Sequence, residues 1–294
     1  MSQTKDGRQL TFDDIGSGGK YDVELLDNHE EVVERRRDLV YEDGTVDCPQ
    51  CGDNYEDLGI GSHWVQSSCD YPQFTQKQYE IVIGSLMGDG SVRRKNKNPY
   101  SNLYNTNTVY LDYVRQQFPL LMTDVKLKST AEEGVEYTRK RNLDYNVSPT
   151  EYHDCYRVRT RGTPDLAELA DWYSSGEKVF DQDLELTPTI TRHWYAGDGN
   201  LDMSHVLRDN GFNSKGNCEI TATNERERSH NITKMFQEAG FDVSFHCDKI
   251  RFTVEETKRF LDWIGPAPPG FSYKWEVQDP DRYKHLKKRA YGDL

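Results

Sequence analysis

Two short stretches, far apart in the sequence, end in the same Gly-Asp-Gly. The first is IVIGSLMGDGSV at 81–92 and the second is ITRHWYAGDGNL at 190–201, and each begins with a run of bulky residues. A single Gly-Asp-Gly would indicate an ordinary turn at the end of a helix, because glycine and aspartate favour turns. Two copies about one small domain apart indicate a duplicated unit in which Asp89 and Asp198 occupy equivalent places.

The elements predicted around the two stretches are also repeated. Thr75 and Gln78 form a capping box for a helix at 75–88, whose apolar residues fall on one face. The order helix, two strands, helix, two strands, helix then occurs twice, which predicts an α+β fold of two αββαββα halves. The other helices are expected at 105–118, 163–173, 188–198, 224–240 and 255–264, and strands at 132–139, 152–161, 218–223, 242–246 and 249–253.

The repeated segments resemble the signature helices of the LAGLIDADG homing endonucleases, in the single-chain type that carries two of them. The likeness covers roughly residues 73 to 280 and is carried by FTQKQYEIVIGSLMGDGSV at 74–92, TITRHWYAGDGNL at 189–201 and FSYKWEV at 271–277. The resemblance implies two saddle-shaped antiparallel sheets with pseudo-twofold symmetry. A central pair of helices would lie against them and carry the catalytic acids at its ends.

The resemblance also implies an active site at these helix ends. Two close carboxylates repel each other unless a divalent cation lies between them, and oxygen ligands with few other side chains suit Mg2+. Such a metal suits phosphodiester hydrolysis, and the reaction of the family leaves 5′ phosphate ends. The implied site residues are the acids Asp89 and Asp198, the metal-binding carbonyls of Gly88 and Gly197, and the lysines Lys178 and Lys274 near the scissile phosphates.

The charge balance bears on the partner of the protein. The formal net charge of −13 by itself argues against nucleic acid, because phosphates bind basic surfaces. The cations are clustered, however, and arginines alternate with other residues at 152–161, so that one face of that strand is cationic. The alternative is a solvated strand face, and an acidic body with basic patches also fits a halophilic archaeon. The residues expected to contact DNA are Arg93, Arg94, Lys95, Arg139, Arg157, Arg159 and Arg161.

Three of the six cysteines lie shortly before the first signature helix. Cys48 and Cys51 have Cys-x-x-Cys spacing, and His63 and Cys69 follow in the same compact segment. Three thiolates and one imidazole make a closed tetrahedral set, which favours a structural zinc ion over a catalytic one. The alternative is a group of unrelated cysteines. We expect the module to add DNA contacts. The cysteines expected to be small buried hydrophobic residues are Cys155, Cys218 and Cys247.

These patterns predict the domains and the function. The expected domains are an acidic arm at 1–47, a zinc-binding module at 48–72, a first half at 73–180, and a second half at 181–294 with a basic tail. Without a signal peptide or a long apolar stretch, we expect a cytoplasmic protein with no membrane contact. We expect a monomeric, Mg-dependent, site-specific endonuclease for a long asymmetric site in double-stranded DNA, free-standing and encoded in a mobile element. The alternative is a non-cleaving binder of the same fold, such as an intron maturase or a regulator.

Overall fold

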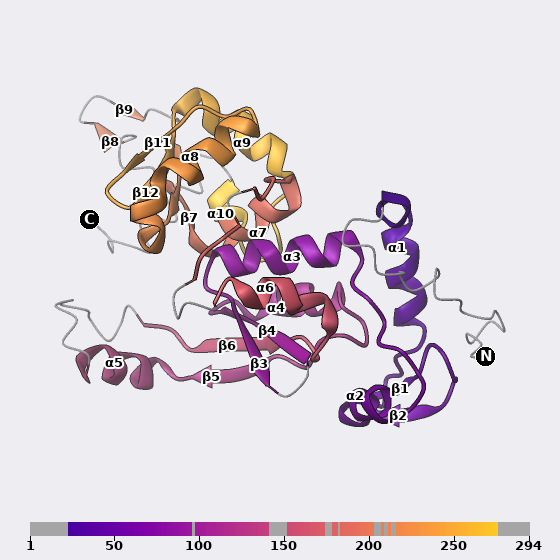
Figure 1. The fold of residues 1–294 in the computed structure, drawn as a ribbon. Helices are drawn as coiled ribbons and strands as arrows, with labels where there is room; N and C mark the ends of the chain where they lie inside the picture. The colour runs from indigo at the N-terminus through magenta and orange to yellow at the C-terminus, as the bar shows by residue number, and fades with distance from the viewer. Residues whose placement is uncertain are drawn as a thin grey trace. The chain divides into compact units, whose positions relative to one another are not determined.

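The computed structural model divides the chain into two compact units, Met1–Val179 and Phe180–Leu294. Figure 1 shows the labelled helices and strands. None of the described helices is long and apolar enough to cross a membrane. The structure describes residues 23–95, 98–140, 152–173, 178–181, 183–202, 207–208, 211–212 and 216–275.

The helix that leads to the first Gly-Asp-Gly is α3 (Gln76–Met87). Thr75 caps it: its hydroxyl accepts a hydrogen bond from the backbone N–H of Gln78, and the Gln78 side chain accepts one from the backbone N–H of Thr75. This is the capping box expected from the sequence. Polar Gln76 and Glu80 are buried along with the apolar residues. The helix is therefore covered on nearly every side instead of on one face.

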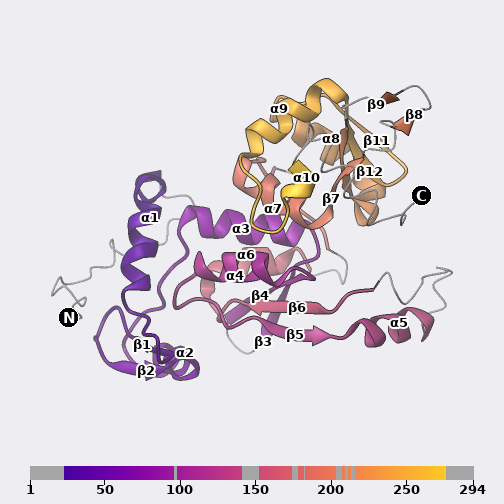
Figure 2. The same ribbon diagram turned by 180° about the vertical axis from the view of Figure 1, so that it is seen from behind.

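The sheet of the first unit has the strand order β3-β4-β6-β5, and all neighbouring strands are antiparallel. Helices α3, α4 and α6 lie on one side of it in both opposite views (Figures 1 and 2). Val92, Leu103 and Val158 point to this covered face and are at most 5% exposed. The elements are β3 (Ser91–Lys95), β4 (Asn98–Asn105), α4 (Thr108–Gln116), β5 (Lys126–Ser129), β6 (Cys155–Arg159) and α6 (Ala167–Asp171), with a 3-10 turn at Pro164–Leu166 before α6.

The second unit has an antiparallel sheet of strand order β11-β12-β10-β7. Its signature helix is α7 (Pro188–Asp198), which Thr187 caps and Pro188 starts. Aromatic side chains fill its core, where Phe252 and Phe260 stack at 4.1 Å. The other elements are β7 (Gly199–Asp202), β8 (Leu207–Arg208), β9 (Gly211–Phe212), β10 (Asn217–Thr221), a 3-10 segment (Thr223–Arg228), α8 (Ser229–Glu238), β11 (Val243–His246), β12 (Lys249–Phe252), α9 (Val254–Ile264) and α10 (Ser272–Trp275).

The four-stranded sheets of the two units and the helices that cover them correspond, although α5 occurs only in the first unit and the β8–β9 hairpin only in the second. Strand β3 follows the first Gly-Asp-Gly as β7 follows the second, and β4, β5 and β6 correspond to β10, β11 and β12. A helix lies between the second and third strand of each sheet, and another follows the fourth. The predicted α+β fold of two αββαββα halves with antiparallel sheets is confirmed.

The prediction of a strand at 132–139 is wrong, because these residues belong to helix α5 (Ala131–Lys140). A capping box starts this helix: Glu133 Oε2 accepts from the backbone N–H of Thr130 at 2.9 Å, and Thr130 Oγ1 accepts from the backbone N–H of Glu133 at 3.3 Å. Lys140 pairs with Glu136 one turn earlier at 2.6 Å. The Thr-x-x-Glu signal for a helix start is therefore stronger than the strand-like composition of the segment.

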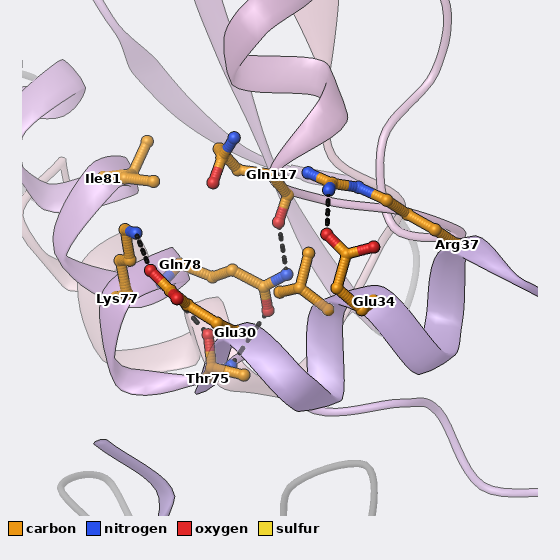
Figure 3. A pocket seen from close by; sticks show the side chains of 9 residues that line it. Glu30, Glu34, Arg37, Thr75, Lys77, Gln78, Ile81 and Gln117 are labelled. Carbon is orange, nitrogen blue, oxygen red and sulfur yellow. Dashed lines mark hydrogen bonds and ion pairs between the residues drawn. The ribbon is translucent and has the colours of Figure 1, made fainter. Parts of the chain in front are cut away.

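The N-terminal helix α1 (Val23–Arg37) is tied to the start of α3 by polar contacts (Figure 3). Arg36 is fully buried and donates to the Gln73 carbonyl and, at 3.3 Å, to the Gln78 side chain. Burial lowers the pKa of Arg36 to about 9, so its guanidinium stays charged at neutral pH. A pocket of about 320 Å³ opens beside these groups. Its cations already pair with carboxylates, as Lys77 with Glu30 and Arg37 with Glu34.

Candidate active site and metal centre

The two Gly-Asp-Gly turns share a packing constraint. In the first unit, a Cβ atom on Gly90 would lie 2.6 Å from the Ser85 carbonyl oxygen; in the second, a Cβ atom on Gly199 would lie 2.3 Å from the Tyr195 carbonyl oxygen. No Cβ atom fits at such distances, so only a glycine allows the backbone to turn directly over the end of each signature helix. Neither glycine has a positive φ. Close approach, not an unusual backbone angle, therefore explains the second glycine of each motif.

These turns place the aspartates at the ends of the signature helices. Asp89 follows α3 and is exposed, and its carboxylate makes no hydrogen bond or ion pair with any residue that the structure describes. Asp198 is the last residue of α7 and is half-buried. The Asp89 carboxylate thus keeps its oxygen lone pairs available for a cation.

A lysine closes the end of each signature helix in the same manner. Lys178 Nζ donates to the three carbonyls directly before Asp89, at 2.9, 3.2 and 2.6 Å. In the second unit, Lys274 Nζ donates to the two carbonyls directly before Asp198, at 2.8 and 3.1 Å. An ammonium group at a helix C-terminus satisfies carbonyls that lack a partner and opposes the negative end of the helix dipole. Each aspartate is therefore preceded by backbone that a buried or half-buried lysine fixes.

The uncovered face of the first sheet carries cations from three strands. Arg93 lies opposite Tyr100, and Arg157 lies opposite Lys126, while Arg159 is on the same face as Arg157 two residues further along β6. The Arg159 guanidinium lies 5.1 Å from the centre of the Tyr100 ring, in a cation–π contact. The described side chains of this face include four cations and no carboxylate, and the cations are Arg93, Lys126, Arg157 and Arg159. It is a basic surface on an acidic protein, and we call it the first basic face.

Two other residues expected to contact DNA, Arg94 and Arg139, lie away from this face. Arg94 points to the covered face, where it donates to the Asp171 carboxylate at 2.9 Å and to the Ala167 carbonyl at 3.2 Å, both on α6. Lys95 is the last residue of β3. Arg139 is exposed in the last turn of α5 and is not part of the sheet. The alternation of β3 thus separates Arg94 from Arg93.

Arg161 is used inside the protein, which corrects the expectation of a DNA contact. Its side chain is only 9% exposed, and it forms an ion pair with the Asp57 carboxylate. It also donates to the Leu120 carbonyl and to the Asp57 carbonyl, both at 2.6 Å. Asp57 starts helix α2 (Asp57–Gln66) of the cysteine-rich module. Arg161 therefore fastens that module to the first sheet.

We predict that Arg161→Ala lowers the free energy of unfolding by about 3 kcal/mol, because it removes a buried charge together with three of its contacts. Arg157→Ala is the matched control, since Arg157 makes no hydrogen bond or ion pair with the described residues; a change of less than about 0.5 kcal/mol is expected. Urea denaturation of both variants measures the difference. Equal stability of the two variants would show that Arg161 does not hold the module.

The four predicted metal ligands converge in the cysteine-rich module. The ligand atoms of Cys48, Cys51, His63 and Cys69 lie within 4.8 Å of one another. Cys51 Sγ is 3.4 Å from His63 Nε2, close to the roughly 3.6 Å that a tetrahedral angle between a sulfur bond of about 2.3 Å and a nitrogen bond of about 2.05 Å implies. His63 Nδ1 is hydrogen-bonded to the Tyr55 hydroxyl at 2.8 Å, which leaves Nε2 directed at the sulfurs. This donor set fits a metal ion that prefers sulfur and nitrogen.

A short hairpin builds this cluster. Strands β1 (Thr45–Asp47) and β2 (Asn54–Glu56) pair antiparallel, and the turn between them carries Cys48 and Cys51. Gly52 has a φ of +74° and donates its backbone N–H to the Cys48 carbonyl at 2.9 Å, which closes the turn. Burial raises the pKa of the Cys51 thiol, so a neighbouring cation is needed to hold it as a thiolate at neutral pH.

The cysteines outside the cluster only partly match expectation. Cys218 is buried in β10, and Cys155 is half-buried in β6. Cys247 is exposed in the turn between β11 and β12, so the prediction that it is buried is wrong.

Comparison with known proteins decides the family. A model described as the LAGLIDADG DNA endonuclease family matches residues 79–260, which include both Gly-Asp-Gly motifs. The chain belongs to this family. The LAGLIDADG chain is also similar to the protein RecA of Mycolicibacterium flavescens, with 22% identity over 218 residues, covering 69% of this chain and 47% of that protein. It therefore spans about half the length of this curated relative.

A solved structure supports the same fold for this LAGLIDADG chain. The homing endonuclease I-WcaI bound to its DNA recognition sequence superposes with a TM-score of 0.55 and 16% identity, covering 74% of this chain and 92% of that one. At this identity, the likeness concerns the fold.

Proposed function

We propose that the protein is a site-specific endonuclease that hydrolyses phosphodiester bonds in double-stranded DNA. The observation that carries this proposal is the aspartate, tight glycine turn and helix-capping lysine that recur in both units. An exposed carboxylate repels phosphate, so a protein that only binds DNA gains nothing from keeping Asp89 in such a place. The pattern thus favours cleavage over a maturase or regulator.

In each half, the aspartate and the preceding glycine carbonyl would hold Mg2+. The oxygens available at the first helix end belong to Asp89 and Gly88, and a set of oxygen donors suits a hard cation. The Gly88 carbonyl accepts from Lys178 at 2.6 Å and the Gly197 carbonyl from Lys274 at 3.1 Å, and a carbonyl oxygen has a second lone pair for a metal. When bound, the ion supplies charge stabilisation and lowers the pKa of water.

The chain's own groups position the reaction. Lys178 and Lys274 hold the backbone before each aspartate, and their charges favour the build-up of negative charge on the phosphate as water adds to phosphorus. The 3′ oxygen then leaves with a proton, and the new DNA end carries a 5′ phosphate. Each half would serve one strand, which gives a double-strand break.

The first basic face supplies the DNA-binding surface of its half. Its four cations can neutralise phosphates, and its side chains stand on a sheet that can enter the major groove. The two halves differ in sequence, so the expected target is long and non-palindromic and the protein acts as a monomer.

The test is a selection of bound sequences from a randomised DNA library, followed by incubation of the selected site with and without Mg2+. We expect one long, asymmetric site and a double-strand break in it only when Mg2+ is present. If the protein binds a specific site but does not cleave it in the presence of any divalent metal, it is a non-cleaving DNA binder and the proposed function is wrong. Failure to select any site would contradict both.

The cysteine-rich module would hold Zn2+ as a structural ion. Its residues Cys48, Cys51, His63 and Cys69 would supply all four ligands, so no position would be left open for a substrate. Arg161 pairs with Asp57 of this module, so the ion would also support the first half of the enzyme.

A further inference from the structure

The uncovered face of the second sheet differs in charge from the first basic face. Glu219 lies opposite Arg251 on one neighbouring strand and opposite Asn200 on the other, and Thr221 lies opposite Lys249. These side chains alternate with the buried core residues of the same strands, so they share the face that helices α8 and α9 do not cover. Here a carboxylate stands among the cations.

Glu219 is almost fully buried and engages both cations. Its side chain is 5% exposed; Oε2 accepts a hydrogen bond from Lys249 Nζ at 2.6 Å, and Oε1 lies 3.0 Å from Arg251 Nε in an ion pair without a well-aligned hydrogen bond. A carboxylate so far from solvent is stable only when it is paired in this way. The ion pairs therefore persist in the folded protein and neutralise much of the local positive charge.

The Nε atom of Arg251 is held by Glu219, while the two terminal nitrogens of its guanidinium are open. Its side chain is 41% exposed, and its guanidinium donates no hydrogen bond to any residue that the structure describes. The two terminal nitrogens can therefore donate in parallel to an outside acceptor. A guanidinium with a restrained orientation loses less conformational entropy on binding and favours two-point contacts over a loose charge contact.

The equivalent position of the first half has no carboxylate that pairs with an arginine. Ser91 and Asn200 each lie two residues after the catalytic aspartate, and their cross-strand partners are Asn102 and Glu219. Asn102 in turn lies opposite Arg159, as Glu219 lies opposite Arg251. The two rows are equivalent, but only the second contains a counter-ion for its arginine.

We propose that Glu219 is a specificity-determining residue, which holds Arg251 as a reader of guanine instead of a phosphate contact. The inference rests on the proposed DNA-cleaving function. Guanine offers O6 and N7 as two adjacent acceptors in the major groove, and this pair matches the two open nitrogens of an arginine. A phosphate is attracted mainly by net charge, and Glu219 lowers the positive charge of this site by one unit. The first basic face then supplies most of the salt-dependent affinity, and the second sheet supplies base readout.

The test compares Glu219→Gln with the wild type on the selected target. The slope of log affinity against log salt should become steeper by about 1, because one cation is released to bind a phosphate. The preference for guanine at one position, measured with a complete set of single-base substitutions in the target, should fall by roughly ten-fold. Glu256→Gln is the matched control, since it causes the same change in net charge in a pair with Arg259 on α9, away from this face. Neither quantity should change in it.

Arg251→Gln keeps the proposal falsifiable if Glu219→Gln does not fold. It should lose the same guanine preference while the salt slope stays within about 0.3 of the wild type. A uniform loss of affinity with a shallower slope would make Arg251 a phosphate contact and overturn the proposal, as would unchanged discrimination in both variants. If the wild type itself selects no site, the proposed function fails instead, so the two failures are distinguishable.

Discussion

Replacing Asp89 by asparagine is expected to slow DNA cleavage by roughly 10³-fold and to leave the affinity for the target within about three-fold of the wild type. Asparagine has nearly the same shape as aspartate but no negative charge, so it cannot hold a divalent cation tightly. Folding should be unaffected, because the Asp89 carboxylate is exposed and bonds to none of the described residues. Single-turnover cleavage and binding in Ca2+ measure the two quantities separately.

Asp171→Asn is the matched control for this prediction. It also removes one carboxylate from the first unit, but Asp171 lies on α6, where it pairs with exposed Arg94 on the covered side of the sheet. Such surface pairs contribute about 0–1 kcal/mol, so cleavage should stay at the wild-type rate. Undiminished cleavage by Asp89→Asn would show that the acid at this helix end is not catalytic. An equal loss in both variants would point to net charge as the cause.

Features that depend on neighbouring residues could be predicted from the sequence. The capping box at Thr75 and the cap at Thr187 are encoded within a few residues, and both helices begin where these signals place them. The Cys-x-x-Cys turn is local as well, and the repeat of the two halves follows from matched element order. The helix at 131–140 had the same kind of start signal at Thr130, which the strand interpretation overlooked.

Features that depend on strand register could not be predicted. Arg93 and Arg94 are neighbours in the sequence, yet the pleat of β3 sends one to the basic face and the other to Asp171. Arg161 continues the alternation of Arg157 and Arg159, but the backbone beyond β6 carries it to Asp57, more than a hundred positions earlier in the chain. The alternation of residues within one strand cannot predict a contact between residues so far apart in the sequence.

Glu219 was overlooked for the same reason. In the sequence, it is one of many acids, in the stretch CEITAT. Its proposed role depends on its burial and on the two cations that the register of β10 and β12 places beside it. A single acidic residue between apolar neighbours in a predicted strand is the one local signal that could have identified it, because a buried carboxylate requires partners.

Removing the metal from the cysteine-rich module is expected to unfold that module and to lower the melting temperature of the protein by roughly 10 °C. Structural zinc contributes about 10–16 kcal/mol to the folding of small zinc modules, so residues 48–72 have little to hold them without it. Unfolding of α2 would also remove Asp57 from its ion pair with Arg161. A decrease of about 3 kcal/mol in the free energy of unfolding corresponds to a decrease of roughly 10 °C in the melting temperature of a domain of this size. Cys51→Ser should have the same effect as a chelator.

Cys247→Ser is the control for this experiment, because Cys247 is an exposed cysteine outside the cluster. Native mass spectrometry should find one zinc ion in the wild type and in Cys247→Ser and none in Cys51→Ser, with thermal melts recorded on the same samples without Mg2+. Limited proteolysis should then cut the zinc-free protein within 48–72. Zinc retained by Cys51→Ser, or an unchanged melting temperature after its loss, would refute the structural role. Because Arg161 links the module to the first sheet, a protein without zinc should also bind DNA more weakly.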